Sequence, residues 1–168
     1  MTTPSPAGPS QAARSLRILT VALAAAPVVI TVAVLSVLGL SGGPDMVAVA
    51  CLGLVVLGAV AAETVGFVVP AIPAGRADDP QQVANRSVAA FQAAAIRRFV
   101  AIEAPFILSI ALAFSFSETA WPVVLTVVPT VLLVLLEVSP SRRNADRTAA
   151  RLERDGATSH LHRALDLA

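Results

Sequence analysis

The chain has 168 residues, of which 56% are hydrophobic and only 14% are charged, and its mean hydropathy is +0.78. A soluble domain has about a quarter of its residues charged, so this composition excludes an ordinary soluble domain and favours a lipid bilayer as the solvent. At this length, one membrane domain with its tails accounts for the whole chain and leaves no room for a soluble catalytic domain.

The first part of the sequence predicts a disordered tail followed by a helical hairpin. Residues 1–15 are rich in proline, serine, glycine and alanine and have little to bury, so we expect no fixed structure there. Residues 18–40 carry no charge and form, as a helix, a rod of about 35 Å that can cross a bilayer. A cleaved signal peptide is the alternative, but Pro27 directly follows the best cleavage site. The turn SGGPD, residues 41–45, predicts an antiparallel second span at about 46–69.

The middle of the sequence predicts a surface helix at about 80–98 that leads into a third span at about 99–116. Asp79 and Pro80 are typical of a helix start, because aspartate caps the free N–H groups and proline needs no hydrogen bond there. We expect this segment to lie on the cytoplasmic membrane surface, because its apolar residues form one stripe. A partner-binding helix of the calmodulin-target type is the alternative. The stripe consists of Val83, Val88, Phe91, Ala95 and Phe99.

The last part of the sequence predicts a fourth span at about 120–138 and a polar helical tail at 139–168. Trp121 stands at the start of this span, where an interfacial anchor belongs. The tail is expected to be solvated near anionic lipid headgroups, and it lacks the aromatic residues of a nucleic-acid site. His160 and His162 form an H-x-H motif, but two ligands without a third do not predict a metal site.

The arginines are distributed unevenly along the chain. All twelve basic residues are arginine; two precede the first span, four lie between the second and third spans, and six follow the fourth. The two short turns carry Asp45 and Glu118 instead. The positive-inside rule therefore predicts that both termini and the middle connection are cytoplasmic. We expect an all-α membrane protein, an antiparallel four-helix transmembrane bundle in the bacterial inner (plasma) membrane.

Two carboxylates inside predicted spans, Glu63 and Glu103, form the candidate polar site. An ionised carboxylate at mid-bilayer costs on the order of 3 kcal/mol, so such residues usually face the interior of a bundle. The helix rise places both residues about 7–9 Å inside the cytoplasmic edge of the membrane, on consecutive spans. We therefore hypothesise that Glu63 and Glu103 meet and share one proton. In the alternative, Glu103 pairs with Arg97 or Arg98. A third carboxylate, Glu137 on the fourth span, lies nearer the same membrane interface.

The run IRRFVAIEAPFILSIALAF, from Ile96 to Phe114, resembles the second helix of the proteolipid c-subunit of rotary ATPases. In that family an acidic residue followed by alanine binds the translocated ion, and the resemblance implies that Glu103 is an ion-binding carboxylate. The chain lacks the glycine-repeat first helix of that family and has four predicted spans in place of two. As a whole, the sequence resembles uncharacterised small bacterial four-span integral membrane proteins.

The sequence contains no catalytic motif of a known hydrolase, metalloprotease, nucleotide-binding or redox enzyme. We therefore expect a non-enzymatic integral membrane protein, an accessory or assembly factor, with no cofactor and no metal. The expected partners are the lipid bilayer and either a second copy of the chain or another membrane protein, with no nucleic acid. The alternative is a small oligomeric carrier of ions, protons or solutes that uses Glu63 and Glu103. A membrane enzyme acting on lipids is less favoured, because its candidate residues are separate glutamates.

Overall fold

The computed structural model describes residues 9–73 and 79–167, and this part of the chain is helical without any strand. This confirms the predicted all-α fold class. The elements are α1 (Pro9–Leu38), α2 (Met46–Val65), α3 (Pro80–Leu112), the π-helical turn η1 (Ala113–Ser117), α4 (Trp121–Glu137), α5 (Arg142–Leu152) and α6 (Leu161–Ala164).

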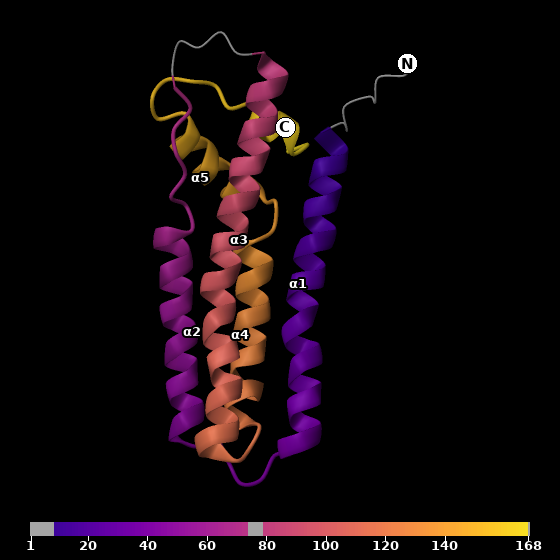
Figure 1. The fold of residues 1–168 in the computed structure, drawn as a ribbon, viewed down its shortest axis with the longest axis vertical. Helices are drawn as coiled ribbons and strands as arrows, with labels where there is room; N and C mark the ends of the chain where they lie inside the picture. The colour runs from indigo at the N-terminus through magenta and orange to yellow at the C-terminus, as the bar shows by residue number, and fades with distance from the viewer. Residues whose placement is uncertain (1–8, 74–78, 168) are drawn as a thin grey trace.

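Four long helices lie side by side and run in alternating directions (Figure 1). Helix α3 occupies the middle, with α2 and α4 against it, and α1 packs mainly on α4. Helices α5 and α6 lie together at the end of the bundle where α3 begins, and we call residues 139–167 the C-terminal module. The module therefore sits at the end of the molecule that carries the arginines.

Three helical stretches are long and apolar enough to cross a membrane: Ala13–Leu38, Met46–Val65 and Pro80–Ser117. A fourth span is reached only by α4 together with α5, two helices that are bent by 56° at their junction. Large apolar side chains cover the outside of these helices, with exposed fractions of 68% for Val29 and 64% for Leu57. Such a surface is the one expected for contact with lipid.

Two segments differ from the sequence prediction. Helix α1 begins at Pro9, so residues 9–15, which we expected to be disordered, are helical, while residues 1–8 lie outside the described part of the chain. The predicted surface helix and third span are one uninterrupted helix, α3. The apolar stripe of α3 packs against protein at this end: Phe91 lies in a cluster with Ala149, Leu152 and Leu161 of the C-terminal module. The module thus covers a face that we had assigned to lipid headgroups.

At the opposite end, the two short connections of the bundle are joined by hydrogen bonds. Asp45 caps α2 by accepting from the backbone N–H of Ala48 at 2.8 Å, and its second oxygen accepts from the Ser117 hydroxyl at 2.5 Å. The Ser117 hydroxyl and the Ala48 N–H stabilise the charged form, and they lower the pKa of Asp45. The indole of Trp121 donates to the carbonyl of Gly42 at 3.2 Å. Trp121, predicted as an interfacial anchor, therefore also holds the two connections together.

Helices α2 and α3 approach each other closely at Gly58. A Cβ atom added there would lie 2.7 Å from the Ala101 carbonyl oxygen and 2.8 Å from the Pro105 ring. Gly53, on the same helix, has open space around an added Cβ. A helix in a membrane approaches its neighbour this closely only through small residues.

We expect Gly58→Ala to lower the unfolding free energy by about 1–3 kcal/mol relative to Gly53→Ala, because its methyl group meets backbone atoms. Both substitutions gain the same intrinsic helix propensity, so Gly53→Ala is a matched control. The measurement is reversible unfolding in mixed detergent micelles, followed by circular dichroism. Equal stability of the two variants would show that the helices are further apart than described.

Candidate functional site

One or two charged residues from each of α2, α3, α4 and α5 meet where the bundle joins the C-terminal module. Glu63, in the last turn of α2, accepts from Arg143 at 2.6 Å and also from Arg147. Arg143 reaches Glu137 with its other terminal nitrogen, at 3.1 Å. Together with the buried Arg98 of α3, these residues form what we call the charge cluster.

The end of α4 dictates where α5 starts. The Asn144 side-chain amide donates to the carbonyl oxygens of Leu136, Glu137 and Ser139, at 2.9–3.0 Å. The carbonyls of Leu136 and Glu137 have no partner further along α4, so a single side chain closes the helix, and its contact with Ser139 turns the chain. The Ser141 hydroxyl accepts from the backbone N–H of Asn144 and caps α5. Because α5 starts here, its residues 143 and 147, which are one turn apart, both face Glu63.

Arg98 is the most deeply buried cation of the described chain, with 0% of its surface exposed. Its guanidinium carbon lies over the Phe67 ring, 4.2 Å from the centroid, and over the Phe91 ring, 5.8 Å from the centroid. The aliphatic part of the Arg98 side chain passes against Gly66, where an added Cβ would overlap Cγ of Arg98. Within the described residues, its guanidinium nitrogens make no hydrogen bond, and neither does Oε2 of the buried Glu137. Ring contact and the nearby carboxylates therefore stabilise the charge.

The charge cluster divides into an inner and an outer part. The outer residues are partly exposed, with side-chain fractions of 38% for Glu63, 49% for Arg143 and 42% for Arg147. Ion pairs at that exposure are screened and contribute at most about 1 kcal/mol each. The inner residues, Arg98 and Glu137, are both buried, and loss of one charge there leaves the other uncompensated. The cluster can therefore hold four helices in one arrangement, with most of its effect in the inner part.

The structure unites three of the predicted polar-site residues and separates the others from them. Glu63, Glu137 and Arg98 belong to the charge cluster, whereas the Arg97 guanidinium donates to the Val68 carbonyl at 2.6 Å. Glu103 is partly buried, and among the described residues it forms no hydrogen bond or ion pair.

We hypothesised that Glu63 and Glu103 share a proton. In the structure, both oxygens of Glu63 instead accept hydrogen bonds from guanidinium groups, those of Arg143 and Arg147. The roles of Arg143, Arg147 and Asn144 are not predicted from the sequence, because a polar tail indicates a solvated helix. The available signal was the spacing of two arginines by four residues next to an asparagine.

The C-terminal module has its own polar contacts. Glu153 accepts from the backbone and hydroxyl of Ser159, at 2.8 and 2.6 Å. Although burial opposes it, these two hydrogen bonds lower the pKa of Glu153. His162 lies 2.6 Å from an oxygen of Asp146, so the H-x-H motif includes one residue that links α6 to α5. Among the described residues, no three metal-ligating side chains come together.

Comparisons with known proteins found no family model, no curated protein and no solved structure that matches this chain.

Proposed function

We propose that this chain is a non-enzymatic accessory or assembly factor of a bacterial plasma membrane, built as an antiparallel bundle of four spans with both termini in the cytoplasm. The observation that supports this best is the charge cluster, which ties α5 to the ends of α2 and α4 and to the middle of α3. A C-terminal module fixed in this way is a rigid platform on the membrane surface, which suits an adaptor for another membrane protein.

The outward face of the platform has the character of a contact surface. On α5 the buried face contains Ala145, Ala149 and Leu152. Arg142 and Arg151 of α5, and Arg154 just after its end, are exposed. Exposed arginine is common in protein interfaces because its planar group makes several hydrogen bonds at once. The platform would thus present arginine to a partner at a fixed height above the membrane.

The alternative function, a small oligomeric carrier, now rests on Glu103 alone. Glu63 is bonded to two guanidinium groups and is poorly suited to exchanging a proton with Glu103. Glu103 remains a partly buried carboxylate within a candidate span, and among the described residues it has no bonded partner. Intramembrane acids often mark ion and proton pathways, so proton flux distinguishes this function from the first.

The proposed orientation makes a direct prediction for cysteine labelling. In a Cys51→Ala background, Gly42→Cys should react with a membrane-impermeant thiol reagent in intact cells, because Gly42 lies in the arginine-free connection. Thr158→Cys, in the exposed part of the C-terminal module, should react only after lysis. Labelling of position 158 from outside would exclude the four-span orientation.

The function itself is tested by releasing the platform. Arg143→Gln with Arg147→Gln removes the contacts to Glu63. Arg14→Gln with Arg17→Gln, at two exposed positions of α1 outside the charge cluster, is a control with the same change in charge. A photo-crosslinking residue at Arg142 should give one discrete adduct in native membranes, present in the control and lost in the release variant. Purified protein in liposomes should show no proton flux above empty vesicles. Flux that disappears in Glu103→Gln, or an adduct that is indifferent to release, would overturn the proposal.

A further inference from the structure

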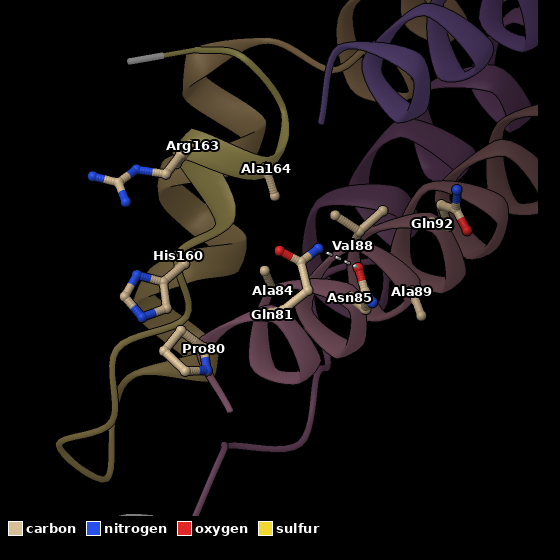
Figure 2. Close-up of a pocket in the computed structure, with 10 residues that line it drawn as sticks. All are labelled: Pro80, Gln81, Ala84, Asn85, Val88, Ala89, Gln92, His160, Arg163 and Ala164. Carbon is tan, nitrogen blue, oxygen red and sulfur yellow. Dashed lines mark hydrogen bonds between the residues drawn. The ribbon is translucent and has the colours of Figure 1, made fainter. Parts of the chain in front are cut away.

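Two hollows follow one another along the same side of α3. The first, of about 260 Å³, lies between the first turns of α3 and helix α6 (Figure 2). The second, of about 190 Å³, lies between α1 and α3 and reaches Val138 at the end of α4. Gln92 lines both hollows, so one ends where the other begins.

The two hollows differ in polarity. The walls of the first include the amides of Gln81, Asn85 and Gln92 on α3. Opposite them lie Arg163 of α6 and His160, the residue just before this helix. Gln81 and Asn85 are hydrogen-bonded to each other at 3.4 Å, a long bond that leaves other donors open. The guanidinium of Arg163 points outward at the rim (Figure 2). Both ionisable groups on this wall are basic, and no acidic side chain of the described residues lines either hollow.

The second hollow is apolar, and its rim belongs to the surface that faces lipid. Its lining from α1 consists of Leu16, Leu19, Leu23 and Thr20, whose hydroxyl is already bonded to the carbonyl of Leu16 at 2.9 Å. Ile96, on the α3 side, has an exposed fraction of 54%, and Leu19, on the α1 side, has one of 45%. Both side chains are part of the candidate spans, so the bilayer itself is next to this opening.

The length of α3 places this change of polarity at the membrane edge. At about 1.5 Å per residue, α3 is about 50 Å long, whereas the hydrocarbon core of a bilayer is about 30 Å thick. Counting back from the outer end of the span at Ser117, the core ends near Arg97. Ile96 and Ala95 therefore lie at the hydrocarbon boundary, and the polar hollow lies in and beyond the headgroup region.

We propose that these two hollows form one binding site for a phospholipid with an anionic headgroup, taken from the arginine-rich side of the membrane. The acyl chain enters between α1 and α3, where it replaces bilayer contacts with Leu19 and Ile96. The headgroup lies above Gln92, where the amides donate to the phosphate and His160 and Arg163 complement its charge. A bound lipid would contact α1, α3, α4 and α6 together and stabilise the contact of the C-terminal module with the bundle.

The test uses the full chain, purified in detergent and then given defined lipids. Native mass spectrometry should show about one phosphatidylglycerol retained per chain, and phosphatidylcholine retained about tenfold less well. Ile96→Trp fills the apolar hollow and Ala89→Trp the polar one; both residues are exposed, so the new rings need not disturb the core. Ala93→Trp, exposed on the same helix and outside both linings, is the control, and it makes the same chemical change as Ala89→Trp.

Each filling substitution should lower phosphatidylglycerol retention by about tenfold or more, and the control should retain it like the unaltered chain. Leu19→Trp repeats the block from the α1 wall, so that misfolding of a single variant does not decide the result. Equal retention in all variants would mean only annular lipid and would overturn the site. Equal retention of phosphatidylcholine would overturn the assignment of an anionic headgroup.

Discussion

Glu137→Gln is expected to lower the unfolding free energy by on the order of 3 kcal/mol, the largest effect of any single charge removal in this chain. Glu137 is 4% exposed and Arg98 is 0% exposed. Among the nearby carboxylates, Glu137 has the strongest electrostatic attraction to the Arg98 guanidinium. Glutamine keeps the size of the side chain and removes its charge. The guanidinium of Arg98 then stays buried without its main counter-charge, and Arg143 keeps only one carboxylate partner, Glu63.

The physical cause can be separated from a general packing defect by a second substitution. Arg98→Met removes the buried cation and leaves an adaptable apolar side chain between Phe67 and Phe91. Added to Glu137→Gln, it should restore most of the lost stability, because replacing both members of a buried pair is often close to neutral. The measurement is a double-mutant cycle on unfolding in mixed micelles, with a coupling of about 2 kcal/mol expected.

Glu63→Gln is the matched control for this cycle. It removes the same charge from the outer part of the cluster, where Glu63 is 38% exposed and its arginine partners are also partly exposed. Its cost should stay within about 1 kcal/mol and shrink at high salt, since exposed ion pairs are screened. Strict additivity of Arg98→Met and Glu137→Gln would show that Glu137 does not compensate the buried guanidinium.

The features that depend on residues close together in the sequence, such as apolar runs and helix starts, were predictable. The runs at 18–40 and 46–69 overlap α1 and α2 along most of their length, because continuous apolar stretches of about twenty residues have few other solutions. Asp79 and Pro80 marked the start of α3 correctly, since capping is a matter of the first turn.

The candidate site depends on contacts that no local pattern contains. Glu63 and Arg143 are 80 positions apart, and they meet only because Asn144 turns the chain at the end of α4. Depth along a helix suggested that Glu63 and Glu103 were neighbours, but depth does not fix the direction in which each side chain points. The burial of Arg98 was also unexpected, since its space is created by Gly66 on another segment.

Asn144→Ala is expected to lower the unfolding free energy by roughly 2–4 kcal/mol, because one buried side chain serves three backbone carbonyls. Asn144 has no exposed surface, so the carbonyls of Leu136 and Glu137 would lose a donor where solvent does not easily replace it. The turn between α4 and α5 would also lose its constraint. Arg143 and Arg147 would then reach Glu63 less often, so we expect part of the cost to appear as release of the module.

Hydrogen exchange measures this release directly. In Asn144→Ala, the amides of α5 should exchange much faster than those of α2, which the substitution does not touch. Asn85→Ala is the control, since Asn85 is exposed and has one long bond to Gln81, and its cost should stay within about 0.5 kcal/mol. Asn144→Asp should be at least as damaging as alanine, because its carboxylate cannot donate and would face carbonyl oxygens. Unchanged exchange in α5 would show that the charge cluster alone holds the module, and Asn144 would then contribute only to the end of α4.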